Sequence, residues 1–171
     1  MTGRLATLST ALGVAVVVVS MIAVRPAPRY IWNASESVPI GLYWLRPAGR
    51  LAATQLVAVE PPEPLATLLA DRRYLPRGIP LLKRVLALPG QTVCRDQLAI
   101  TVDKIEMGAA RAHDRSGRPL PIWQGCHVIA DGEVFLMNWR SADSFDGRYF
   151  GALPTSSIIG TAEPLWTGEE E

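Results

Sequence analysis

The sequence predicts a mainly β protein: an antiparallel β-sheet domain preceded by one apolar N-terminal helix. The chain has 171 residues, enough for one domain of ordinary size. Its 14 glycines, 14 prolines and only 7% aromatic residues favour a turn-rich β domain over a helical bundle. Short apolar stretches recur between turn signals, without the alternation of strands and long helices that indicates a parallel sheet.

Composition and charge exclude several classes of protein. Seventeen basic and 16 acidic residues give a net charge of +1, so no overall field attracts nucleic acid. An apolar content of 49% with 19% charged residues excludes a disordered chain. Two cysteines are too few for a disulfide framework or for a metal cluster made of cysteines alone. No motif indicates a cofactor or a metal.

Residues 1–24 are expected to form an N-terminal membrane anchor. Residues 5–24 contain no charge, and a helix of about 20 residues spans the hydrocarbon core of a bilayer. The alternative is a cleaved secretory signal, whose apolar stretch is usually about 7–15 residues long and ends in small residues. Arg4 precedes the segment whereas Arg25 and Arg29 follow it, so charge alone does not orient the helix.

Residues 25–171 form the one remaining domain. The acidic tail, Glu169–Glu171, is expected to be a solvated end. One short helix is expected at 63–73, with Pro64 in its first turn. Strand-like stretches bounded by turn residues predict the strands 42–45, 55–59, 81–88, 92–94, 98–102, 104–107, 127–130, 134–138 and 157–162.

Cys94 and Cys126 lie 32 positions apart, each at the boundary of an expected strand. A disulfide between them would restrict the unfolded chain by about 3.5–4 kcal/mol and would place the domain in an oxidising compartment. Two buried free thiols are the alternative. A zinc site that adds His113 and His127 is disfavoured, because adjacent strand residues point to opposite faces and no C-x2-C spacing is present.

The first segment with possible chemistry follows the apolar helix directly. Ser35 and Ser37 stand two residues apart, before Pro39 and Gly41, which predicts an exposed turn close to the membrane. Taken alone, a serine-rich turn is more often only a turn.

The second segment is an apolar strand that contains a lysine. Period two places Lys83 on the same face as Leu81 and Val85. Burial there would lower the lysine pKa from about 10.4 toward the range of a general base. The alternative is an edge-strand pair of Lys83 and Arg84 whose charged ends reach water.

The third segment gathers Ser144, Asp146 and Arg148 before a Gly-Ala-Leu-Pro turn, although Asp146 and Arg148 alone could brace a loop. In order, content and spacing, the three segments resemble the type I signal peptidase family. That family has Ser-x-Ser-x-x-Pro after a membrane anchor, then Lys-Arg-Val and Leu-Pro-Gly, then Ser-x-Asp-x-Arg-Tyr-x-Gly. From Asn33 to Trp166 the likeness is closer to its conjugative-transfer branch, the TraF-type pilin-processing peptidases.

The resemblance implies a signal-peptidase-like fold and a role for each matching residue. Ser37 matches the nucleophile and Lys83 the general base that takes its proton. Ser35 matches a hydroxyl that forms the oxyanion hole together with the backbone N–H of Ser37. The supporting set comprises a hydroxyl that orients the lysine and an ion pair: Ser144, Asp146 and Arg148.

The chain departs from the family pattern at three places. Val38 stands where the leader-peptide branch usually has methionine, Gly147 replaces a usual serine, and a Gly-Asp-Asn-Arg run is absent around residues 138–140. These departures disfavour general signal-peptide cleavage and affect neither Ser37 nor Lys83.

We therefore expect a membrane-anchored Ser/Lys endopeptidase that processes an exported precursor, such as a conjugative pilin, with hydrolysis and cyclisation both open. A general signal peptidase and a non-catalytic membrane-anchored assembly protein are the alternatives. The expected location is the inner membrane with the catalytic domain in the periplasm, or the soluble periplasm if residues 1–24 are removed. Tyr30, Trp32 and the apolar segment 39–44 are expected to hold the catalytic face against the bilayer, unless they fill the β core.

Overall fold

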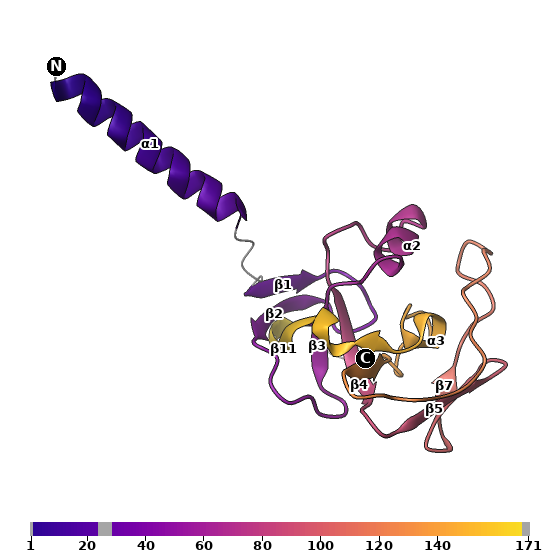
Figure 1. The fold of residues 1–171 in the computed structure, drawn as a ribbon. Coiled ribbons are helices and arrows are strands. Elements are labelled where there is room, and N and C mark those ends of the chain that lie inside the picture. Colours follow the sequence, from indigo (N-terminus) through magenta and orange to yellow (C-terminus); the bar gives the residue numbers. More distant parts are fainter. Residues whose placement is uncertain (1, 24–28, 169–171) are drawn as a thin grey trace.

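The computed structural model describes residues 2–23 and 29–168 (Figure 1). The expected boundary at residues 24 and 25 and the tail Glu169–Glu171 lie outside the described residues. In chain order the elements are α1 (Thr2–Ala23), β1 (Tyr30–Asn33), β2 (Gly41–Arg46), β3 (Leu56–Val59), α2 (Leu65–Asp71), β4 (Leu81–Ala87), β5 (Thr92–Asp96), β6 (Ala99–Val102), β7 (Ile105–Ala109), β8 (Gly125–Val128), β9 (Glu133–Leu136), α3 (Gly147–Phe150), β10 (Leu153–Pro154), a 3-10 turn (Thr155–Ser157) and β11 (Ile158–Thr167).

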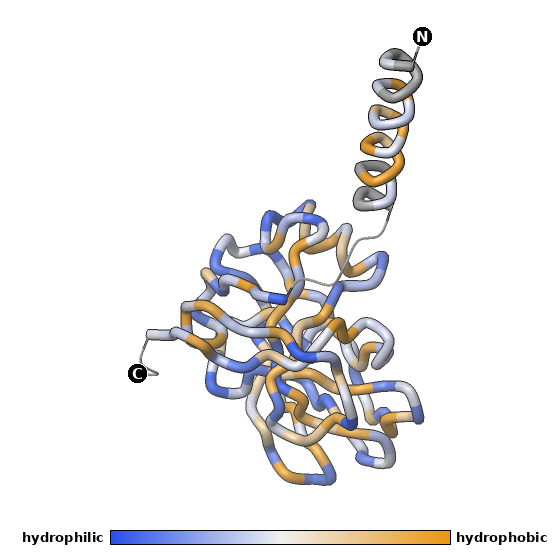
Figure 2. The backbone as a smooth tube through the Cα atoms, turned by 90° about the vertical axis from the view of Figure 1, so that its left-hand side faces the viewer, coloured by the Kyte–Doolittle hydropathy of each residue, from blue (hydrophilic) through white to orange (hydrophobic). Residues whose placement is uncertain are grey.

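The N-terminal segment forms a helix, α1, of 22 residues. Figure 2 shows hydrophobic residues along this helix, and Leu8, Leu12 and Val16 are among its exposed side chains. Within residues 2–23 and 29–168, no helix combines the length and the apolarity required of a membrane span.

The strands form two sheets, and every named strand pair is antiparallel, as the sequence predicts. The larger sheet has seven strands in the order β1-β2-β11-β3-β4-β9-β10. The smaller sheet has four in the order β7-β6-β5-β8 (Figure 1). The long strand β11 pairs with both β2 and β3, and so connects the N-terminal hairpin to the centre of the larger sheet.

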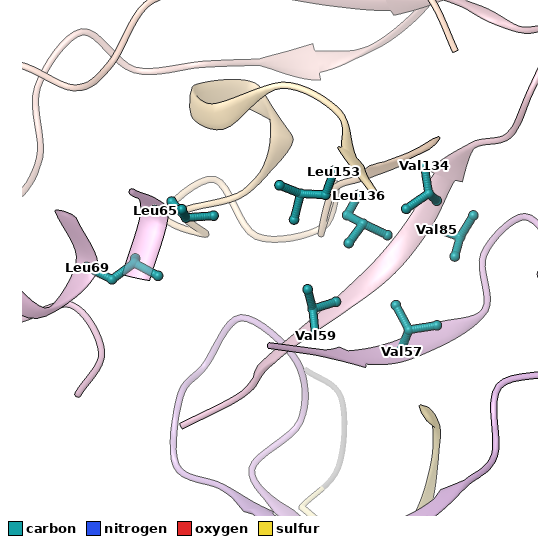
Figure 3. Close-up of a cluster of buried hydrophobic side chains, with 8 residues drawn as sticks. All are labelled: Val57, Val59, Leu65, Leu69, Val85, Val134, Leu136 and Leu153. Carbon is teal, nitrogen blue, oxygen red and sulfur yellow. The ribbon is translucent and has the colours of Figure 1, made fainter. Parts of the chain in front are cut away.

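Strand β4 has side chains in three hydrophobic clusters, which explains why it is so apolar. Val85 belongs to the first cluster, which also contains Leu136 of β9 and, at its far end, Leu69 of α2 (Figure 3). Leu86 packs with residues of β5 and β6 in the second cluster. Because both faces of this interior strand are covered, a lysine on it has apolar neighbours whichever way it points.

Each of the nine predicted strands overlaps an observed strand, whereas two short strands and one short α-helix were not predicted. The strand expected at 127–130 begins two residues earlier, at Gly125, and the helix expected at 63–73 is shorter, with Pro64 as its N-cap. The unpredicted elements are β1, β10 and α3, each of four residues or fewer. Such lengths carry too few residues for a periodic pattern.

Cys94 and Cys126 form a disulfide with an S–S distance of 2.03 Å. They stand directly opposite each other on β5 and β8. The bond excludes the alternatives of two free thiols and of a zinc site that uses these cysteines. His127 instead contacts Glu133 at 2.7 Å, and the described residues contain no group of three or more histidine, cysteine or acidic side chains arranged to hold a metal.

Candidate active site

The turn between β1 and β2 presents the two predicted serines. Ser35 is exposed and Ser37 is half-buried, and their hydroxyl oxygens lie 3.1 Å apart. Tyr43, buried on β2, donates from its hydroxyl to the carbonyl oxygen of Pro39 at 2.7 Å. The turn is thereby fastened to the sheet on its C-terminal side.

Gly41 is required where this turn joins β2. Its φ is +153°, and a Cβ atom there would lie 2.1 Å from the carbonyl oxygen of Trp166 on β11. No side chain fits at that separation, so only glycine lets β11 pass beside the start of β2. The glycine of the Pro-x-Gly part of the motif is thus explained by strand packing next to the serines.

Lys83 lies on β4 with only 4% of its surface exposed. Its ammonium nitrogen, Nζ, donates a hydrogen bond of 2.8 Å to Oγ of Ser144. Burial lowers the pKa of Lys83 from 10.5 to about 8, with Asp146 acting to raise the pKa and Arg148 to lower it. A substantial fraction of this lysine is therefore neutral near pH 8, as a general base must be.

Asp146 and Arg148 form a buried ion pair beneath the lysine, with exposures of 0% and 1%. The guanidinium binds both carboxylate oxygens, at 2.8 Å from Nε and 2.9 Å from Nη2. Nη2 also donates to the carbonyl oxygens of Ser141 and Ser144, at 2.6 and 3.1 Å. The pair therefore holds the loop that carries the Ser144 hydroxyl.

Close packing explains why residue 147 is a glycine in this chain. A Cβ atom at this residue would lie 2.7 Å from the carbonyl oxygen of Leu136 and 2.8 Å from Cζ of Phe135. Serine, the usual residue at this place in the family pattern, would therefore push α3 away from β9.

Asn138 is a member of the site that the sequence analysis did not assign. It is 2% exposed, and its backbone N–H donates to Oδ2 of Asp146 at 3.0 Å. Its side chain accepts from the N–H of Arg84 and donates to the carbonyl oxygen of Leu82, at 3.0 and 3.2 Å. Asn138 thus links the carboxylate of the ion pair to the strand on both sides of Lys83. The sequence feature that could have indicated Asn138 is its place as a polar residue directly after the apolar run 134–137.

Arg95, on β5 of the smaller sheet, was also not assigned. It is 1% exposed, and Nη1 donates to the carbonyl oxygen of Arg148 at 2.6 Å. Its Nη2 is buried without a hydrogen-bond partner among the described residues. This side chain connects the disulfide-bonded sheet to α3.

Both serines of the turn, Lys83 and Ser144 line one open cavity of about 1010 Å³. The ammonium hydrogen bond of Lys83 is made to Ser144, and the hydroxyl of Ser37 is paired with Ser35. Along the cavity, Arg115 contacts Asp143 at 2.6 Å and Glu36 at 4.0 Å. The fold therefore brings the three separate sequence segments to a single opening.

Comparisons with known proteins identify the family that this chain is similar to. A family profile described as "Signal peptidase, peptidase S26" matches residues 2–166. The chain is 36% identical over 147 residues to a conjugal transfer protein TraF of Agrobacterium fabrum, covering 81% of this chain and 82% of that protein. It is 31% identical over 144 residues to a plasmid transfer protein TraF of Escherichia coli, covering 79% and 81%. A solved signal peptidase I of Enterococcus faecalis V583 is 16% identical with a TM-score of 0.39, covering 66% of this chain and 97% of that structure.

Proposed function

This chain belongs to the S26 family of signal peptidases, and from that premise we propose that it is a serine endopeptidase with a Ser37/Lys83 dyad. The observation that carries the proposal is a buried lysine, with its pKa lowered to about 8, that lines the same cavity as a half-buried serine. A neutral amine can take the place of histidine as the base that activates a serine hydroxyl.

In the first step, Nζ of neutral Lys83 accepts the hydroxyl proton of Ser37 while Oγ attacks the scissile carbonyl carbon. The backbone N–H of Ser37 and the hydroxyl of Ser35 would stabilise the resulting oxyanion, and one such donor is worth about 3–4 kcal/mol. Ser144 accepts a hydrogen bond from Nζ of Lys83. An N–H of the amine therefore faces Ser144, and the lone pair of the amine points elsewhere.

In the second step, the Lys83 ammonium returns the proton to the departing amine as the C–N bond breaks, which leaves an acyl ester on Ser37. A water molecule or a second amine, activated by the same lysine, then attacks the ester. Water gives a linear product, whereas the amino terminus of the same precursor gives a cyclic one.

The substrate we propose is an exported precursor, namely a conjugative pilin. This part of the proposal is supported by the relatives at 31% and 36% identity, which are named plasmid and conjugal transfer proteins. General removal of leader peptides and a non-catalytic assembly role are the alternatives that the experiment below separates.

The proposed location is the inner membrane, with residues 1–24 as a single-pass anchor and the catalytic domain in the periplasm. Support comes from the 20 uncharged residues at 5–24 and from the disulfide, since such bonds persist outside the cytosol. A reporter that works only in the periplasm, fused after Glu171, tests this placement. Activity of a cytoplasmic reporter there would overturn it.

We also propose that the catalytic face lies against the bilayer, where it meets a membrane-embedded precursor. Trp32 and Trp166 are 55% and 68% exposed, with ring centroids 5.7 Å apart. Trp32 lies on β1, which leads into the serine turn, and Trp166 lies on β11, which pairs with β2 after that turn. Tyr30 and Ile40 extend this exposed apolar area on either side of Trp32 along the chain. Aromatic residues of this kind are enriched at membrane–water interfaces.

The test uses the purified full chain, a candidate pilin precursor in detergent, and intact mass spectrometry of the products. We expect cleavage by the wild type and by Ser156→Ala, an exposed serine outside the cavity, and none by folded Ser37→Ala. A cyclic product is lighter than the linear one by one water, about 18 Da. Cleavage by Ser37→Ala would overturn the proposal, and cleavage of unrelated leader peptides at equal rate would favour the general peptidase.

A further inference from the structure

The side chain of Asn33 organises the turn that carries the proposed nucleophile. Asn33 is the last residue of β1 and is 8% exposed. Its Nδ2 donates to the carbonyl oxygens of Ser35, Val38 and Pro39, at 2.7, 2.9 and 3.0 Å. One amide group therefore ties together the two ends of the turn on either side of Ser37.

The amide oxygen of Asn33 has two donors, both from one residue. Oδ1 accepts the backbone N–H of Ser35 at 3.2 Å and the hydroxyl of Ser35 at 2.9 Å. The amide orientation is determined by these contacts, because the oxygen faces a backbone donor and the nitrogen faces three carbonyl acceptors.

The hydroxyl of Ser35 has a single hydrogen. The partner to which it donates that hydrogen therefore decides whether Ser35 donates or accepts in its contact with Ser37. With that hydrogen on Asn33, the oxygen of Ser35 can only accept at the 3.1 Å contact with Ser37. The resting site then holds a chain of hydrogen bonds from the Ser37 hydroxyl through Ser35 to Oδ1 of Asn33. In this state the Ser35 hydrogen is not available to an oxyanion.

We propose that Asn33 is a positioning residue: it holds the serine turn and keeps the Ser35 hydrogen until the transition state, when that hydrogen turns from Oδ1 to the oxyanion. The inference rests on the proposed function. No covalent bond changes in the rotation. Oδ1 keeps the backbone N–H of Ser35 after the hydroxyl has turned, so no buried acceptor is left without a partner.

The test measures kcat and KM on the same precursor for Asn33→Asp, Ser35→Ala and their double variant. A carboxylate binds the Ser35 hydroxyl more strongly and lacks both N–H donors. We expect Asn33→Asp to lower kcat by about 10- to 100-fold with KM within about threefold. In the Ser35→Ala background the same substitution should lower kcat by a factor at least about threefold smaller, because the effect through the hydroxyl is gone and only the loss of the Nδ2 donors remains.

Asn33→Thr is the second variant, since its hydroxyl can still accept the N–H of Ser35 in the turn and β-branched residues suit a strand end. It should fold and, because it also lacks the two N–H donors that hold the turn, lower kcat by more than about threefold. Wild-type and Ser37→Ala chains are measured alongside. Cleavage by Ser37→Ala would overturn the proposed function itself. Two outcomes would overturn the role of Asn33 alone, provided that Ser37→Ala is inactive. One is a kcat of either Asn33 variant within threefold of the wild type. The other is an equal loss of kcat on Asn33→Asp in the chain with Ser35 and in the chain with Ser35→Ala.

Discussion

At the scale of single residues, the site depends on how much the fold disfavours a charge at Lys83. The side chain is 4% exposed, and one carboxylate, that of Asp146, lies in a bidentate pair with Arg148. Because that carboxylate is already neutralised, it only partly offsets the burial that lowers the pKa of the lysine. The balance produces an amine that gains and loses its proton near pH 8.

The first prediction concerns stability. The pKa of Lys83 is about 8 in the folded chain and about 10.4 in the unfolded chain, so between these values the unfolded chain binds more protons. The free energy of unfolding of the wild type should therefore rise across pH 8 to 10.5 by about 3 kcal/mol relative to Lys83→Met. Below pH 8 the variant should be the more stable protein. Urea denaturation at each pH measures this, and parallel curves for the two proteins would contradict it.

The second prediction concerns Lys83→Arg. A guanidinium keeps its proton at any working pH, because its pKa exceeds about 12, so it cannot accept the proton of Ser37. We expect cleavage of the precursor to fall below detection. The matched control is Arg84→Lys, at the next residue of the same strand, which should keep activity within about threefold. Retained turnover by Lys83→Arg would remove this lysine from the mechanism.

At the scale of elements, the four-residue helix α3 depends on close packing against β9. Gly147→Ser should destabilise the protein by about 1–3 kcal/mol, because its Cβ would lie 2.7 Å from a backbone oxygen. Activity should fall as well, since Arg148 on α3 holds the Ser144 loop. Gly49→Ser is the control, because nothing lies within 4 Å of a Cβ there. Thermal unfolding of the two variants checks this, and equal melting temperatures would contradict it.

The elements also show how far the sequence predicts the fold and where it cannot. Strands β3 and β4 were predictable because Val57 and Val85 belong to short apolar runs bounded by turn residues. Helix α3 was not, because its first turn depends on Asp146, which caps the N–H of Arg148 within the buried ion pair. Lys83 was found through its apolar neighbours, whereas the role of Asn33 depends on contacts with a turn whose shape no periodicity predicts.

At the scale of the whole molecule, the proposed contact with the membrane makes a prediction about substrates. Trp32→Gln combined with Trp166→Gln should lower turnover of a precursor embedded in liposomes by several-fold. Turnover of a short free peptide should be unchanged. The control is Ile105→Gln, a side chain 66% exposed on β7 of the other sheet. Equal effects on the two substrates would contradict a membrane-facing catalytic surface.

The measurement that tests the central claim most directly is the dependence of kcat/KM on pH, from pH 6 to 10, for the wild-type chain. This ratio reports the ionisation of the free enzyme, in which the pKa of Lys83 is lowered to about 8. We predict that kcat/KM rises about tenfold per pH unit below pH 8 and is constant above pH 9. Two results would contradict a Ser37/Lys83 dyad. One is a profile of kcat/KM whose rise reports an apparent pKa near 6.5, where histidine titrates, and the other is a kcat/KM that does not depend on pH.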